Sequence, residues 1–368
     1  ALMGGAVTGA ATRGIAIGNS SSSEANDAFA IGRATQASGA NSMALGENAL
    51  ATGISSTSFT NGIASGNFSL AGLFGTASGT NSIALNGSAS GAGAVSISGT
   101  AAGENSMALM GGAVTGAATR GIAIGNSASS EANDAVAIGQ GTQALGTNAI
   151  AIGNNITAYS YGETVLGYHQ ETYIPISTNS NSANDRLFVI GNGDVTLGLP
   201  SENNAFTILK NGRTGIMRIP TTNILEVGGQ ASKNSAGDWV ANSDSRLKKN
   251  IETFKEQEAL NKLLQMRGVT YEWNDKQTGS QRPEGIQYGF IAQEIKEVFP
   301  ENVELDNLGY YQTAYGTYDA MYVQAIKALN NKLESLEAEN ETLKNEIQKI
   351  YSLLNQGSSN EKEMVTRE

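Results

Sequence analysis

Two side chains whose types can perform nucleophilic chemistry lie five residues apart in the sequence, at Ser243 and Lys248. A serine hydroxyl attacks a carbonyl carbon when a neighbouring base removes its proton, and lysine is one of the bases that proteins use. A lysine side chain has a pKa of about 10.4 in water, so this role requires burial or a neighbouring cation to lower that value. Arg246 and Lys249 are the nearby cations in the sequence. The chemistry open to the pair is acyl transfer, with attack on the carbonyl of Asn242, the preceding residue.

The spacing alone does not bring the two side chains together. On an α-helix, five residues leave side chains about 140° apart around the axis. The pair therefore requires the backbone to turn between them. Ser243 and Asp244 are also residue types that cap helix N-termini, so a helix start followed by basic residues is the alternative structure for this segment.

The chain after this segment has the pattern of a small α+β body followed by a coiled coil. The alternation over 269–273 predicts a strand, and 293–299 predicts a short helix that ends at Pro300. From Tyr322 onward the apolar residues recur with heptad spacing. Positions a are Ile326, Leu333, Ile347 and Leu354, and positions d are Leu329, Leu336, Leu343 and Ile350. Asn340 is the polar exception at a, a residue type that fixes register, and residues 357–368 are predicted to form a disordered tail.

These motifs follow one another in an order that is specific as a set. They are Ser243-Asp244-x-Arg246-Leu247-Lys248, the Tyr-Gly-Phe-Ile-Ala-Gln-Glu-Ile run at 288–295, the Phe-Pro-Glu run at 299–301, and the terminal heptads. The set resembles the self-cleaving intramolecular chaperone domain at the C-terminus of phage endosialidases. The resemblance implies that Ser243 and Lys248 form a catalytic dyad, that the chain cuts itself once between Asn242 and Ser243, and that three chains assemble. It implies no metal, no cofactor and no separate substrate.

The first 167 residues are a repeat of short rungs in which apolar and small residues alternate. The period is 14 residues at 15–17, 29–31 and 43–45, shortens to 12 at 83–85, 95–97 and 107–109, and returns to 14 from 122–124 onward. Alternation at period two places the two bulky residues on one face and the small residue on the other. Residues 1–32 recur almost unchanged as 108–139, so Ala1 interrupts a rung and is expected to be a fragment boundary or a domain edge.

A rung of three residues buries too little surface to be stable alone, so the rungs are expected to stack into a continuous core. One chain does not cover both edges of so small a coil, whereas three chains wrapped together would. The pattern resembles the head repeats of trimeric autotransporter adhesins, which implies a parallel β-roll in a three-chain assembly. A structural or antifreeze-like β-solenoid without a ligand is the alternative.

Residues 168–242 are predicted to be a β-hairpin connector or tip between the repeat and the C-terminal part. One hairpin is expected to join 187–190 to 194–197 through Gly191-Asn192-Gly193, and a second to turn at Asn211-Gly212. A further strand is expected at 223–229.

The composition excludes several classes of function. The chain has 368 residues with 45 Gly, no Cys and a net charge of −11. The absence of Cys removes disulfides and thiolate chemistry, and the negative charge argues against a nucleic-acid partner. No run of 18 apolar residues is present, so membrane insertion is not expected. The nine charged residues within 1–160 are too sparse to define a pair of catalytic carboxylates.

We therefore expect a mainly β, trimeric parallel β-roll or solenoid fibre with a hairpin connector, a small α+β domain and a C-terminal coiled coil. The expected parts are 1–167, 168–242, 243–320, 321–356 and the tail. The resemblances imply a phage or phage-like tail fibre, assembled in the host cytoplasm, that binds a cell-surface receptor, either a glycan or an outer-membrane component. The alternatives are a bacterial surface adhesin or structural solenoid without cleavage, and a polysaccharide-cleaving tailspike.

Overall fold

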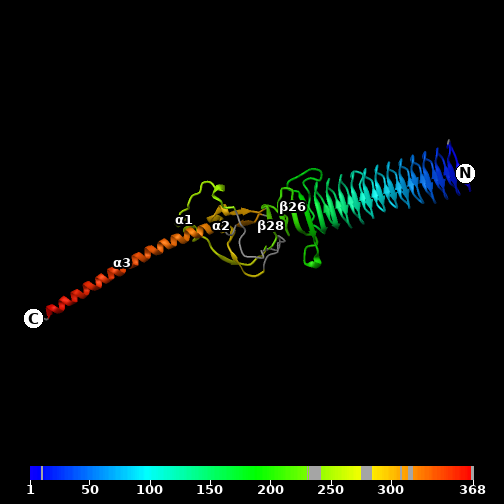
Figure 1. Cartoon of the computed structure of the whole chain (residues 1–368). Coiled ribbons are helices and arrows are strands. Elements are labelled where there is room, and N and C mark those ends of the chain that lie inside the picture. The colour runs from blue at the N-terminus through cyan, green and yellow to red at the C-terminus, as the bar shows by residue number, and fades with distance from the viewer. Residues whose placement is uncertain are drawn as a thin grey trace. The chain divides into compact units, whose positions relative to one another are not determined.

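The computed structural model describes residues 1–9, 11–229, 231, 242–274, 284–306, 309–313 and 318–365. The chain divides into two compact units, Ala1–Ala231 and Ser232–Glu368, and each is described by itself (Figure 1). None of the helices in the described ranges is long and apolar enough to span a bilayer.

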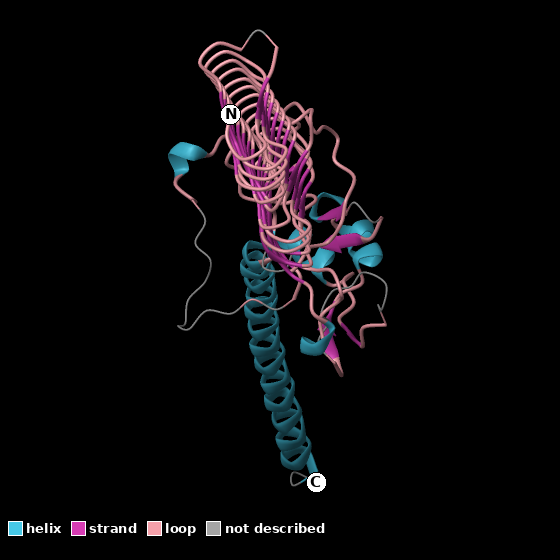
Figure 2. Cartoon of the chain, turned by 90° about the vertical axis from the view of Figure 1, so that its right-hand side faces the viewer, coloured by secondary structure: helices cyan, strands magenta, loops and turns pink. Residues whose placement is uncertain are grey.

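The first unit is a β-solenoid in which successive strands alternate between two parallel stacks (Figure 2). The 12-stranded sheet contains β1 (Ala6–Val7), β3 (Ser22–Ser23), β5 (Gln36–Ala37), β7 (Leu50–Ala51), β9 (Ile63–Ala64), β11 (Thr76–Ala77), β13 (Ser88–Ala89), β15 (Thr100–Ala101), β17 (Ala113–Val114), β19 (Ser129–Ser130), β21 (Gln143–Ala144) and β23 (Thr157–Ala158). The 16-stranded sheet begins with β2 (Ile15–Ile17), β4 (Phe29–Ile31), β6 (Met43–Leu45), β8 (Thr57–Ser58), β10 (Leu70–Gly72), β12 (Ile83–Leu85), β14 (Val95–Ile97), β16 (Met107–Leu109), β18 (Ile122–Ile124), β20 (Val136–Ile138), β22 (Ile150–Asn154) and β24 (Thr164–Tyr168).

The space between the two sheets is filled mostly by alanine and serine side chains, with a few larger ones such as Val114. The middle residue of each three-residue strand is fully buried, as in Ala71, Ala84 and Ala108, and each pairs in parallel with the equivalent residue of its neighbours. The opposite sheet supplies a matching column that includes Ala77 and Ala89. The alternation expected from the sequence is present, and the small residue is the one that the single chain buries.

The bulky apolar residues of the same strands point away from this core. Each three-residue strand places its first and third residues outward, so they form two columns along the 16-stranded sheet. Examples are Ile15 at 40%, Met43 at 37%, Ile97 at 44% and Ile152 at 42% exposure. The outward residues of the 12-stranded sheet are mostly Ser, Thr and Gln. The solenoid therefore has one apolar and one polar face.

Two turns complete each coil, and we name them from the strand of the 16-stranded sheet that they flank. The leading turn precedes that strand and the trailing turn follows it. Gly79 begins a leading turn, and a Cβ at this position would lie 2.0 Å from the carbonyl oxygen of Gly91 in the next coil, so only glycine permits this stacking. The Ser82 hydroxyl donates to the Gly79 carbonyl at 2.6 Å and closes the same turn.

A cluster of buried polar side chains closes the end of the solenoid. Among the described residues, the alanine core of the earlier coils has no equivalent of this cluster. Glu163 is fully buried, and its carboxylate accepts bonds from the Ser160 backbone N–H at 2.8 Å and from the Tyr173 hydroxyl at 3.2 Å. The Arg186 guanidinium lies 4.1 Å from the centre of the Tyr173 ring. Burial raises the pKa of the Glu163 carboxyl, while these hydrogen bonds oppose that rise.

The remaining strands of the first unit continue the 16-stranded sheet. They are β25 (Arg186–Asn192), β26 (Asn204–Leu209), β27 (Thr214–Ile216) and β28 (Leu225–Val227). The hairpin predicted to turn at Asn211-Gly212 is confirmed, because β26 and β27 pair antiparallel across it. The hairpin predicted between 187–190 and 194–197 is wrong. Residues Val195–Leu197 form a 3-10 turn capped by the Asp194 carboxylate, and β25 pairs with β26 instead.

Within its described residues, the second unit contains three α-helices and two antiparallel two-stranded sheets. Its elements are a 3-10 turn at Ser245–Leu247, α1 (Glu256–Leu263), β29 (Val269–Tyr271), β30 (Gln287–Gly289), α2 (Ala292–Val298), a 3-10 turn at Pro300–Asn302, β31 (Val303–Leu305), β32 (Tyr311–Thr313) and α3 (Asp319–Val365). The strand expected at 269–273 and the helix expected at 293–299 are both present.

Helix α3 leaves its heptad positions uncovered in the single chain. The apolar residues at a and d from Ile326 to Leu354 are each 51–64% exposed. Near its start, α3 packs through Ala325 and Ala328 against Leu260 of α1. The helix continues through Val365, so the residues from 357 to that point are helical where a disordered tail was predicted.

The alanine core predicts a sharp difference between two adjacent positions. Ala84→Leu should lower the free energy of unfolding by about 1–3 kcal/mol, because the added atoms have no space between the sheets. Ile83→Leu is the matched control, since Ile83 points outward and is 36% exposed. Thermal unfolding followed by circular dichroism measures both. An Ala84→Leu protein as stable as the parent would contradict this account of the core.

Candidate functional site

Ser243 and Lys248 are joined by a direct hydrogen bond. The Lys248 Nζ donates to Ser243 Oγ at 2.7 Å. The backbone makes this possible because Ser245–Leu247 forms one 3-10 turn between extended residues, Asp244 at ψ 136° and Lys248 at ψ 148°. The turn that the spacing required is therefore present. Both side chains are exposed to solvent in the single chain.

The Asp244 side chain stabilises this turn through its contacts with Arg246. Its carboxylate accepts the Arg246 backbone N–H at 2.8 Å, and it also binds the Arg246 guanidinium through Nε at 3.0 Å and Nη2 at 2.8 Å. Hydrogen bonding from the Arg246 side chain lowers the pKa of the Asp244 carboxyl. Asp244 is thus an N-cap, as the alternative interpretation of the sequence expected, and it caps the turn that brings Lys248 back to Ser243.

This pairing corrects one expectation about the cations near Lys248. Arg246 was considered a positive neighbour that favours the neutral amine of Lys248. In the structure its guanidinium is ion-paired with Asp244 at 2.8 Å, so its charge is compensated locally. The Asp244–Arg246 clamp was missed by sequence reasoning. The sequence signal for it is a pair of oppositely charged residues two positions apart, in the segment between Ser243 and Lys248.

The second group of motif residues builds the interior of the unit. Ile295 and Phe299 are 1% and 0% exposed and pack with Val303 and Tyr318. Phe290 packs against the same cluster. The described contacts therefore assign the run at 288–295 a structural role.

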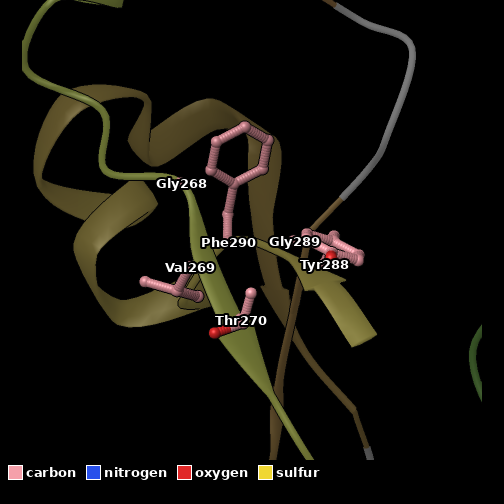
Figure 3. A pocket seen from close by; sticks show the side chains of 6 residues that line it. All are labelled: Gly268, Val269, Thr270, Tyr288, Gly289 and Phe290. Carbon is pink, nitrogen blue, oxygen red and sulfur yellow. The ribbon is translucent and has the colours of Figure 1, made fainter. Parts of the chain in front are cut away.

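The hairpin of β29 and β30 carries an open hollow on its surface (Figure 3). Its volume is about 590 Å³, and it is lined by Gly268, Val269, Thr270, Tyr288, Gly289 and Phe290. Tyr288 is 82% exposed. The lining contains no carboxyl, amine, imidazole or thiol group, and its one ionisable side chain is the exposed Tyr288 phenol, so it offers no nucleophile–base pair like Ser243 and Lys248.

Comparison with known proteins matches two parts of the chain. Residues 243–304 match the family model described as chaperone of endosialidase, and this match begins at Ser243. Residues 10–35, 37–59, 117–142 and 132–155 match the YadA head domain repeat. No curated protein matches the chain. Both resemblances inferred from the sequence are confirmed.

These matches and the solenoid define a class of protein. A β-solenoid with adhesin-like head repeats, followed by a chaperone-of-endosialidase segment, fits a tail fibre or an adhesin. The endosialidase-chaperone family is one of self-cleaving intramolecular chaperones.

Proposed function

We propose that this chain is part of a trimeric tail fibre of a phage or phage-like particle, and that its C-terminal segment promotes assembly and then cleaves itself off between Asn242 and Ser243. The observation that carries the proposal is the 2.7 Å hydrogen bond between Lys248 and Ser243, at the residue where the chaperone-family match begins. The family match supports the role of a C-terminal chaperone, and the solenoid supports a fibre.

The reaction needs only the chain and one water molecule. The neutral Lys248 amine, placed where the ammonium now donates, accepts the Ser243 hydroxyl proton while Oγ bonds to the carbonyl carbon of Asn242. The bond from that carbon to the Ser243 nitrogen then breaks, the nitrogen takes a proton, and an ester links the two residues. Water hydrolyses the ester, which leaves a carboxylate on Asn242 and a free amine on Ser243.

Assembly into a homotrimer would cover two apolar surfaces that the single chain exposes. One is the pair of outward columns on the 16-stranded sheet, and the other is the heptad stripe of α3. Pairs of opposite charge at g and e, such as Lys332 with Glu337 and Glu339 with Lys344, suit a coiled coil in register. Because the rungs are alike, chains that meet along the repeat can pair out of register. Gathering the C-termini first makes the correct pairing local.

As a tail fibre, the protein would be assembled in the host cytoplasm, form part of the virion and bind a cell-surface receptor. The second candidate is a bacterial surface adhesin, which the YadA-type repeats favour. A polysaccharide-cleaving tailspike is disfavoured, because charged residues are sparse in the repeat and two of its acids are ion-paired, Asp27 with Arg13 and Asp134 with Arg120 at 2.6 Å each. Genes for tail proteins beside the coding sequence, as opposed to a secretion anchor, would separate fibre from adhesin.

Self-cleavage is tested directly by intact-mass analysis of freshly expressed protein. We expect a fragment that begins at Ser243. Ser243→Ala and Lys248→Ala should each leave the full-length chain, because the reaction needs both the nucleophile and the base. Lys255→Ala, at an exposed lysine outside the turn, is the matched control and should cut as the parent does. Normal cutting by Lys248→Ala would rule out the dyad.

The Asp244 clamp predicts a graded effect on the same reaction. Replacing a capping Asp by Ala costs about 0.5–2 kcal/mol, so Asp244→Ala should slow cleavage by roughly 2- to 30-fold through a less populated turn. Asp244→Asn retains capping ability and should be slowed less. Equal rates for all three proteins would show that the clamp is dispensable.

The coiled coil predicts a loss of assembly from two changes on its seam. Leu336→Asp with Leu343→Asp places charge at two d positions, and we expect misassembled or insoluble protein. Ser335→Asp with Thr342→Asp changes the adjacent c positions and should leave the trimer intact. Light scattering measures the mass of both. Soluble trimers from the Leu variant would mean that assembly is driven elsewhere.

A further inference from the structure

One coil of the solenoid holds bulky apolar residues in both of its turns. Phe68 lies in the leading turn of β10 with φ 59°, and Leu73 and Phe74 form the trailing turn with φ 52° and 69°. The three side chains are 61%, 61% and 73% exposed. Left-handed backbone is unfavourable for residues with a Cβ, and a bulky residue there is an outlier that calls for an explanation.

Neighbouring coils place small polar residues at the equivalent positions. The register of β10 with β8 and β12 aligns Phe68 with Ser55 and Asn81, and it aligns Leu73 with Thr60 and Asn86. At the positions that align with Phe68 and Leu73, the neighbouring turns therefore carry no apolar side chain. The β10 coil departs from the pattern at both ends of one strand.

Each apolar turn has support beside it. The Phe68 backbone N–H donates to the Ile54 carbonyl at 2.8 Å, and Ile54 is 48% exposed in the leading turn of the coil before. We call Ile54 and Phe68 the leading patch, and Leu73 and Phe74 the trailing patch. No charged residue occurs between Glu47 and Glu104, so both patches lie in an uncharged part of the solenoid.

We propose that the leading patch of one chain packs against the trailing patch of the next chain, at the level of β10, so that three such contacts close the ring. The proposal rests on the homotrimer of the proposed function. A cyclic assembly is built from heterologous contacts, in which each chain presents two different surfaces that fit one another. The two patches lie at opposite ends of the same strand, and hence at opposite edges of the apolar face. When that face turns inward, the edges of adjacent chains meet.

Met110 is an exposed apolar residue in a trailing turn, and the leading turn of the same strand has no exposed apolar residue to match it. It lies in the trailing turn of β16 with φ 56° and 71% exposure, and it aligns with Leu73 through the strand register. The leading turn of the same strand carries Glu104 and Asn105. By the same reasoning, Met110 makes no apolar contact of this kind.

The paired patches would give the trimer a fixed axial register. The outward columns look alike from rung to rung, and residues 108–139 nearly repeat 1–32, so the columns alone tolerate a slip. A slip of one coil would separate the two patches by about 4.8 Å, the spacing of neighbouring strands. The β10 coils of the three chains would then have to lie at the same height along the trimer axis.

Replacement by asparagine gives a test whose sign depends on the proposal. Phe68→Asn and Leu73→Asn each relieve left-handed strain and remove exposed apolar surface, so an unpartnered patch predicts an unchanged or more stable trimer. A patch that contacts the next chain predicts a lower denaturant midpoint for trimer dissociation. Met110→Asn is the control and should leave that midpoint unchanged or raise it. A midpoint for the two test variants at or above that of the parent overturns the proposal.

Cross-linking tests the contact itself, and the full chain suits it because it has no cysteine. We expect Phe68→Cys with Phe74→Cys, treated with a short bis-maleimide, to give a three-chain band on a denaturing gel. Each single variant should give at most a small dimer fraction. A protein that is trimeric by light scattering but forms no cross-link overturns this contact and leaves the trimer standing. A monomer in light scattering overturns both.

Discussion

The thinness of the alanine core is the constraint from which most of this structure follows. Side chains such as Ala71 and Ala84 are fully buried between the two sheets, and the largest side chain in the same buried cluster is Val114. A strand of three residues has one inward position, so its two bulky residues must point outward. The apolar surface that would be the interior of an ordinary domain becomes the exterior of this chain. Stability of the single chain then rests on stacked hydrogen bonds and alanine packing, and in the proposed trimer the larger hydrophobic gain would come when other chains cover the outward columns.

That division gives a physical reason for a separate assembly device. Columns of Ile, Leu and Met are attractive to one another at many registers, because each rung offers nearly the same contacts. A heptad seam with one polar residue, Asn340, discriminates between registers far better, since a misplaced Asn is left against apolar neighbours. In the proposed trimer, the heptad seam of α3 would fix the register of the three chains. The outward columns of the solenoid would supply most of the apolar area that assembly buries.

The sequence predicted the repeat, the strand alternation and helices α2 and α3, because each depends on local periodicity, but it did not predict α1. The hairpin at 211–212 was predictable because Asn-Gly favours a tight turn, whereas Gly191-Asn192-Gly193 gave a similar signal and no hairpin. There, the Asp194 carboxylate binds the Thr196 backbone N–H at 2.8 Å and forms a local turn, a competition that periodicity does not reveal. The contact between Ser243 and Lys248 was inferred from a family resemblance, while its geometric cause, the Asp244 clamp on Arg246, required coordinates.

The contacts that hold Ser243 and Lys248 together are local. The formation of the pair is therefore a separate question from the time at which the proposed cleavage occurs. Every described contact that shapes the turn lies within Ser243 to Lys248, so the pair can form in one chain without help from the solenoid. Both residues are nevertheless open to water there. In the proposed reaction, covering the site would exclude water from the pair, and burial disfavours charged groups. If the other chains of the proposed trimer supply that cover, cleavage controlled by cover would follow assembly. Under the proposed function, the trimer would therefore form first, and the chain would lose its C-terminal segment only after that segment had acted.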